Sequence, residues 1–235
     1  MTPGAGAGGC HLLAACVLVA CALVACLAPL VLHAQTGPPP ASSPVTSPHQ
    51  GGTLNLVAST SGGTLDPQIN YTGEYINLFV SVYDGLLTFR KATGQAGTEI
   101  VPDLAQAIPV SPDRGLTYTF TLRPGLYFSN GQPVGVEDVV ASFRRIFRVG
   151  SPTAGAFYGA IAGADDCLRA PATCTLAKGV TADPANRTIT FHLVRPDTEF
   201  MHKLAFIHAV ILPASSPDHD TGNWLFYPSP TPRDR

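Results

Sequence analysis

The sequence contains little charge of either sign. Only 13% of the 235 residues are Asp, Glu, Lys or Arg, and the formal net charge is −2. The chain has no excess of positive charge that would attract nucleic acid or an anionic membrane surface, so we expect no nucleic-acid partner. The apolar content of 45% is enough for a hydrophobic core and excludes wholesale disorder.

Motifs of hydrolytic enzymes are also missing. The sequence has no Gly-x-Ser-x-Gly, no His-Glu-x-x-His and no paired-thiol metal motif. His202 and His208 are six residues apart, so they would not share one helical face, which disfavours a metal site there. We therefore expect no catalytic residue, no metal and no cofactor, and an exported hydrolase remains only as an alternative.

The N-terminus has no lysine or arginine before its apolar run, Leu12 to Leu32. The positive segment of a standard signal peptide is thus missing, yet the run predicts that residues 1–34 are an export signal. Cleavage after Ala34 is one interpretation, and an uncleaved anchor is another, because about twenty apolar residues span a bilayer. The third is lipidation at a cysteine that ends a lipobox-like stretch, Cys16, Cys21 or Cys26. Each interpretation predicts an exported protein, periplasmic or at the cell surface.

After this signal, residues 35–50 contain five prolines among small and polar residues, a composition typical of an extended linker. Two of the six cysteines, Cys167 and Cys174, follow the linker. In an oxidising compartment we expect them to form a local disulfide, worth about 2.5 kcal/mol in the chain-entropy model. A zinc site is the alternative, which the lack of a second cysteine pair disfavours.

Apolar periodicity predicts short strands and helices, and the 23 glycines and 22 prolines predict many turns. The expected strands are 53–57, 86–89, 98–101, 117–122, 126–128 and 186–193. The expected helices are 75–83, 136–148 and 197–206, with a short helical turn at 102–107.

The helix expected at 136–148 has the clearest pattern. One apolar stripe runs along it, formed by Val136, Val139, Val140, Phe143, Ile146 and Phe147. Acids occupy its first turn and Arg144, Arg145 and Arg148 its last, which matches the helix dipole. We expect these charges to stabilise the helix and to do no chemistry.

Seven short segments follow one another between Gly51 and Pro213. They are Leu65-Asp-Pro67, Tyr83-Asp-Gly-Leu-Leu87, Pro102-Asp-Leu-Ala105, Leu116-Thr-Tyr-Thr-Phe-Thr-Leu-Arg-Pro-Gly125, Phe128-Ser-Asn-Gly-Gln-Pro-Val134, Glu137-Asp-Val139 and Ser142-Phe-Arg-Arg145. In order and spacing they resemble the family 5 extracellular solute-binding proteins, the peptide, oligopeptide and nickel receptors of ABC importers.

The resemblance implies an α/β fold of the periplasmic-binding-protein type II kind, with two lobes that close on a solute by a hinge motion. Residues 51–213 would form the N-terminal portion of this domain, mainly the first lobe with a mixed sheet. The implied partners are a peptide or another small solute and a membrane ABC permease, and the protein would be a monomer. The resemblance places ligand contacts at Ser59, Thr60, Ser61 and Gly62, with Tyr71 and Tyr75 as further candidates.

The sequence departs from the family pattern after Ile211-Leu-Pro213. The family continues there with Gly-Thr-Gly-Pro-Tyr into the second lobe, whereas this chain has Asp220-Thr-Gly222 and then a proline-rich stretch. We therefore interpret residues 214–235 as an irregular, aberrant tail, with a frameshift near Asn223 and a truncated second lobe. An exported non-catalytic fragment or adhesion-type protein is the remaining alternative.

Overall fold

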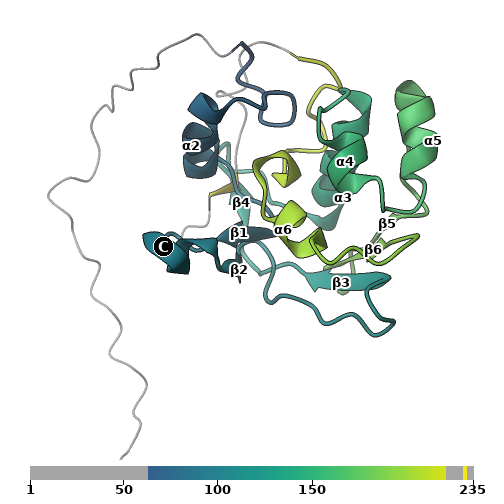
Figure 1. The fold of residues 1–235 in the computed structure, drawn as a ribbon, viewed down its shortest axis with the longest axis horizontal. Coiled ribbons are helices and arrows are strands. Elements are labelled where there is room, and N and C mark those ends of the chain that lie inside the picture. Colours follow the sequence, from purple (N-terminus) through teal and green to yellow (C-terminus); the bar gives the residue numbers. More distant parts are fainter. Residues whose placement is uncertain (1–62, 221–229, 232–235) are drawn as a thin grey trace, which may run out of the picture. The chain divides into compact units, whose positions relative to one another are not determined.

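Three small antiparallel sheets and one long helix organise the part of the chain that the computed structural model describes, residues 63–220 and 230–231 (Figure 1). These residues all lie in one structural unit, Leu56–Arg235. Its helices are α2 (Gly73–Val82), α3 (Val136–Arg148), α4 (Ala154–Tyr158), α5 (Ala164–Arg169) and α6 (Phe200–Leu204), with 3-10 turns η1 (Gly94–Thr98), η2 (Pro171–Thr173) and η3 (Ile207–Ala209). Its strands are β1 (Leu87–Phe89), β2 (Ile100–Pro102), β3 (Thr117–Thr121), β4 (Tyr127–Phe128), β5 (Val180–Asp183), β6 (Thr188–His192) and β7 (Pro230–Thr231).

The largest sheet has the strand order β3-β6-β5, so the strand that comes last in the sequence is the central one. In its register Phe120 pairs with Ile189 and Val180 pairs with Phe191, and all four side chains are buried. On the other face, the hydroxyls of Thr119 and Thr190 lie 2.9 Å apart. The alternation expected from the sequence for β3 and β6 is confirmed, with apolar residues inward and threonines outward.

Helix α3 packs its apolar stripe against this sheet, and Figure 1 shows α3 and α4 on one side of β5 and β6. The ring of Phe143 lies edge-on to the ring of Phe191, with centroids 4.8 Å apart. At the start of the helix, the Gly135 backbone N–H donates to the Asp138 carboxylate at 2.8 Å. The helix predicted at 136–148 is confirmed with the same bounds. We call the buried side chains of Phe120, Phe143, Ile189 and Phe191 the sheet core. Burial of each large apolar side chain stabilises the fold by about 1.5–3 kcal/mol.

The strands predicted at 86–89 and 98–101 are confirmed as β1 and β2, which form an antiparallel pair in which Thr88 lies opposite Val101. The helical turn expected at 102–107 is wrong, because this segment forms bends around an isolated antiparallel bridge between Ala105 and Leu122. Its backbone N–H groups donate to other parts of the chain: Leu104 to the Gly85 carbonyl at 3.0 Å and Gln106 to the Thr121 carbonyl at 2.8 Å.

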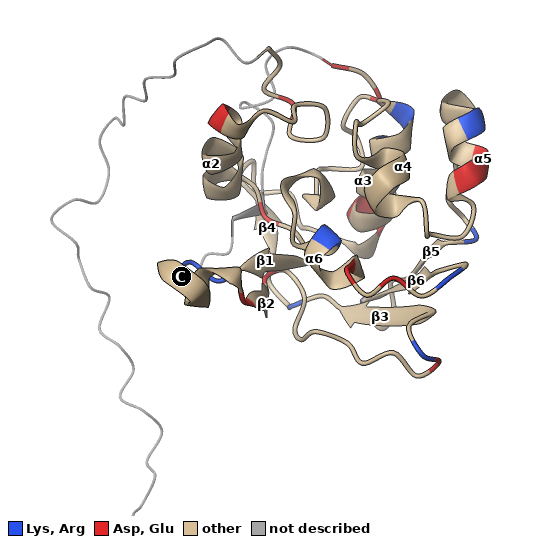
Figure 2. Cartoon of the chain, in the orientation of Figure 1, with Lys and Arg blue, Asp and Glu red and all other residues tan. Residues whose placement is uncertain are grey.

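Other elements differ in length or were not expected. Helix α6 spans five residues, fewer than the ten of the helix expected at 197–206. Helices α4 and α5 and strand β5 lie between residues 149 and 185, where the sequence analysis expected no helix or strand. Helix α5 carries acids in its first turn and Arg169 in its last, as Figure 2 shows by colour.

The disulfide predicted between Cys167 and Cys174 is present. It connects α5 to the residue that follows η2, and both cysteines are buried against the main core. The Arg148 guanidinium on α3 donates to the Cys174 carbonyl oxygen at 2.9 and 3.0 Å. The cross-linked loop is therefore held against the same helix that covers the sheet.

A second, smaller core lies beneath α2. Its buried members are Phe79, Tyr83, Ile207, Val210 and Leu212. Within α2 only Phe79 is fully buried, because the helix lies at the surface of the unit. Within residues 63–220, no helix has the length and apolar character needed to cross a membrane.

Candidate functional site

The predicted solute-binding segment, Ser59, Thr60, Ser61 and Gly62, lies outside the described residues. The structure does describe the turn that follows it, residues 64–70, and Tyr71 beyond the turn. These residues and the groups that contact them form the candidate site. Their role in binding a solute stays a prediction.

Tyr71 is 53% exposed and lies against two aromatic rings. Its ring centroid is 6.0 Å from that of Phe206 and 5.3 Å from that of His208. Tyr71 thus presents one face to solvent while the other is fixed by packing, an arrangement suited to contact with an apolar or cationic group. Tyr75, by contrast, is partly buried and stacks on Phe79 with centroids 6.1 Å apart.

His208 is fully buried beneath Tyr71, and among the described residues its ring nitrogens have no side-chain hydrogen-bond partner. Burial lowers the pKa of His208 to about 4, and the backbone of Asn70 opposes this shift only in part. The ring is therefore neutral at neutral pH, and it stacks on Phe206 at 5.4 Å. The neutral His208 ring therefore supports the ring of Tyr71 from its buried side.

The turn at 64–70 is held together by its own polar groups. The Asp66 backbone N–H donates to the Thr64 hydroxyl at 3.0 Å, and the Gln68 backbone N–H donates to an Asp66 carboxylate oxygen at 2.9 Å. The Asn70 amide donates to the Thr64 carbonyl at 2.5 Å. Asp, Asn and Thr side chains stabilise tight turns in this way.

Asp66 and Arg145 form a buried ion pair between this turn and α3. Arg145 is 2% exposed and Asp66 0%. The two terminal guanidinium nitrogens donate to the two Asp66 carboxylate oxygens, at 3.2 Å and 2.6 Å. Burial raises the pKa of Asp66 above its usual value, and the Arg145 charge and its hydrogen bonds oppose that rise.

The guanidinium of Arg145 also contacts two other parts of the chain. It donates to the Gln68 side-chain oxygen at 2.9 Å, to the Pro217 carbonyl at 2.7 Å and to the His219 carbonyl at 3.3 Å. We call Asp66, Gln68, Arg145, Pro217 and His219 the Arg145 junction. The sequence pattern assigned Arg145 to the helix dipole, whereas the structure shows it as a tertiary ion-pair residue.

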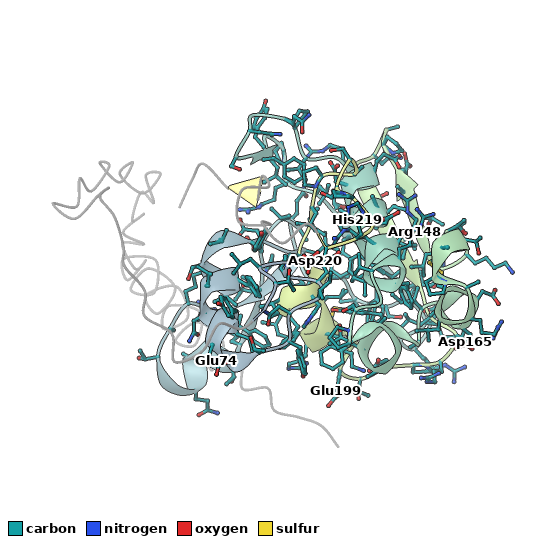
Figure 3. All side chains as sticks on the ribbon, turned by 90° about the horizontal axis from the view of Figure 1, so that it is seen from above. Glu74, Arg148, Asp165, Glu199, His219 and Asp220 are labelled. Atoms are coloured by element: carbon teal, nitrogen blue, oxygen red, sulfur yellow. A yellow bond between two sulfur atoms is a disulfide. The ribbon has the colours of Figure 1, made fainter. Side chains whose placement is uncertain are left out.

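Residues 212–220 pass along α3 and are hydrogen-bonded to it, although they form no helix or strand. The Leu212 backbone N–H donates to the Ser142 hydroxyl at 2.8 Å, and Arg148 pairs with Asp218 at 2.7 Å. Figure 3 shows Arg148, His219 and Asp220 gathered on one side of the unit, away from Glu74 and Glu199. The predicted boundary at residue 213 thus falls within a segment that is bonded to the fold up to Asp220.

Tyr71, the predicted binding residue that the structure describes, does not line the cavity beside the disulfide. This cavity has a volume of about 360 Å³, and the charged side chains that line it are Asp166, Arg169 and Lys178. Among residues 63–220, no cluster of three or more histidine, cysteine or acidic side chains has the geometry of a metal site.

The comparison with known protein families gives a match over more than half of the chain. Residues 99–229 match the profile of bacterial extracellular solute-binding proteins, family 5, described as the middle region. The chain belongs to this family. The matched region includes all the strands of the main sheet, α3 and the segment that carries Pro217 and His219.

Individual relatives agree with this assignment. The dipeptide-binding protein of Escherichia coli is 31% identical over 173 residues, which cover 69% of this chain and 30% of the relative. The probable D,D-dipeptide-binding periplasmic protein DdpA of the same organism is 28% identical over 158 residues, which cover 66% of this chain and 27% of the relative.

Among solved structures, the clavulanic acid biosynthesis oligopeptide binding protein 2 matches with a TM-score of 0.59 and 29% identity. The match covers 69% of this chain and 30% of that protein. The expected fold class, an α/β portion of a two-lobed solute-binding protein, is thereby confirmed. The mixed sheet expected within it is wrong for the described residues, because all of their strand pairs are antiparallel. The chain spans less than a third of the length of the curated relatives it matches.

Proposed function

We propose that this chain is part of the extracytoplasmic substrate-binding component of an ABC importer. It would capture a peptide or a related small solute and deliver it to a membrane permease. The observation that carries this proposal is the family match over residues 99–229, together with relatives that are binding proteins for dipeptides and oligopeptides.

The proposed mechanism is binding and release without catalysis. Ser59, Thr60, Ser61 and Gly62 would offer short side chains and backbone groups to an extended peptide, and Tyr71 would contribute a fixed aromatic face. A solute that touches both lobes of a complete receptor favours the closed form by its difference in affinity for the two forms. No bond to the solute is made or broken in this scheme.

The location follows from the same proposal. The family consists of extracellular solute-binding proteins, so the chain would be exported, with residues 1–34 as the signal and residues 35–50 as a tether. Cleavage after Ala34, lipidation and retention as an anchor are three forms of this proposal, and mass spectrometry of the mature N-terminus would separate them. The protein would act as a monomer.

Equilibrium dialysis of the full 235-residue chain would test solute binding, with dialanine, trialanine and a nickel–histidine chelate as probes. We expect one of the three to bind with a dissociation constant between about 1 mM and 1 μM, which corresponds to about 4–8 kcal/mol. If none binds at millimolar concentration, the proposal is wrong for this chain.

A pair of tyrosine variants provides the matched control. Tyr71 and Tyr127 are both substantially exposed, at 53% and 40%, but only Tyr71 belongs to the candidate site. We expect Tyr71→Ser to weaken binding of the probe and Tyr127→Ser to leave it unchanged. Equal effects of the two variants would argue against the placement of the site.

A further inference from the structure

Three segments that are distant in sequence meet at the guanidinium of Arg145. Asp66 and Gln68 come from the turn that follows the predicted solute-binding segment, and Arg145 comes from α3. Pro217 and His219 come from the segment that follows the last turn of the described fold. The contacts span 72 to 79 residues of sequence.

The chemistry of the junction requires an arginine. A guanidinium has five N–H donors in a fixed plane, and Arg145 makes five hydrogen bonds with them. Two bonds go to the Asp66 carboxylate, one to Gln68 and two to backbone carbonyls. A lysine would carry the same charge, but its single ammonium cannot reach acceptors on both sides in this geometry.

Gln68 extends the same connection. Its side-chain amide donates to the Ser142 carbonyl on α3 at 3.1 Å and to the His208 carbonyl at 3.4 Å. The turn is thereby tied to the residue that underlies Tyr71. A displacement of the turn would therefore disturb the aromatic packing of Tyr71 on His208.

We propose that Arg145 is a positioning residue for solute binding, which fixes the 64–68 turn against residues 217–219 and so sets the position of Tyr71. This inference rests on the proposed function. Arg145 is buried and does not itself touch the solute. Its effect is transmitted through Asp66 and Gln68, because the Gln68 amide donates to the His208 carbonyl and the His208 ring contacts the ring of Tyr71.

Amide hydrogen exchange of the full chain tests the connection without any ligand. In Arg145→Lys we expect exchange to rise by about tenfold in peptides that cover residues 64–70 and 217–220 together, while peptides from β3 and β6 stay protected. Unchanged protection of residues 64–70 would overturn the proposal. So would a uniform rise over the whole unit, which would indicate a purely global role in stability.

Arg148→Lys is the matched control, since Arg148 lies on the same helix and pairs with Asp218 but has no contact with the 64–68 turn among the hydrogen bonds described. We expect its exchange effect to stay near residues 174 and 218. If Arg145→Lys does not fold, Gln68→Met replaces it. This variant keeps the Asp66–Arg145 pair and should still raise exchange at residues 64–70.

Equilibrium dialysis with trialanine then tests whether Arg145 affects solute binding. At equal folded fraction, measured by circular dichroism, we expect Arg145→Lys to weaken binding by about tenfold and Arg148→Lys to leave it unchanged. Equal affinity of Arg145→Lys and wild type would overturn the positioning role. If the wild type binds no probe, the proposed function fails, and the exchange result then decides separately whether Arg145 connects the two segments.

Discussion

The Arg145 junction and the sheet core stabilise two neighbouring regions of the unit by different interactions. The sheet core joins β3, β6 and α3 through aromatic and aliphatic side chains, whose attraction is non-directional. The junction joins three segments through the buried Arg145–Asp66 ion pair and the other hydrogen bonds of Arg145, which are directional. We therefore expect the sheet core to tolerate conservative changes and the junction to tolerate almost none.

Removal of one partner from the junction should have the largest effect. Arg145→Met leaves the Asp66 carboxylate buried without its cation, and we expect a loss of about 3–5 kcal/mol in the free energy of unfolding, measured in urea. The double variant Arg145→Met with Asp66→Leu should recover most of this loss, because no buried charge remains. A double variant as unstable as the single one would contradict this account of the ion pair.

Acidification should also weaken the region beside the junction, through His208. Its pKa is about 4 in the folded chain and near 6.5 when exposed. As pH falls from 6.5 to 4, the unfolded chain binds a proton that the folded chain does not, so stability decreases by about 3 kcal/mol over this range.

Urea titrations at several pH values would measure this effect. His208→Phe should remove that part of the pH dependence, because it keeps an aromatic ring between Tyr71 and Phe206 without a titrating group. His202→Gln, at an exposed position on α6, should behave like the wild type. Identical pH profiles for wild type and His208→Phe would disprove the assignment.

Loss of the disulfide should have a smaller effect, confined to the sheet-core side. Replacement of Cys167 and Cys174 by alanine should lower the free energy of unfolding by about 2.5 kcal/mol, because the cross-link restricts a short loop of the unfolded chain. Thermal melts with and without reductant would show this for the wild type. Amide exchange at residues 64–70 should not change. A change there would mean that the disulfide also stabilises the Arg145 junction and that the two regions are not independent.

The smallest effect is expected for a conservative change in the sheet core. Ile189→Val removes one buried methylene and should cost about 1 kcal/mol. Arg145→Lys is also conservative in size and charge, yet we expect it to cost more, because several hydrogen bonds are lost at once. Urea denaturation of the two variants side by side gives a direct test, and equal losses would mean that the regions do not differ.

Much of the fold could be predicted because its patterns are local. The stripe on α3 and the alternation in β3 and β6 are complete within each segment, and their bounds agree closely with the structure. Helices α4 and α5 are too short for one turn of periodicity to stand out. The segment after β2 was wrongly expected to be helical because its hydrogen-bond partners, such as the Thr121 carbonyl, are distant in sequence.

The candidate site was less predictable for a similar reason. The seven segments of the family resemblance include both Asp66 and Arg145, but no sequence pattern shows that they pair across 79 residues. An arginine in the last turn of a helix fits the helix dipole equally well. Only the burial of both groups distinguishes the two interpretations. The burial of His208 likewise depends on the ring of Tyr71, far away in the sequence.

The strand order of the main sheet has a consequence for biosynthesis. Because β6 is the middle strand, β3 leaves the ribosome before either other strand of its sheet. About seventy further residues, including all of α3, must follow before Thr121 can pair with Thr188. During that interval the backbone of β3 is unpaired and its Tyr118 and Phe120 side chains are uncovered, so another nascent chain could pair with this strand. Slow translation through this stretch would therefore increase the need for a chaperone before export.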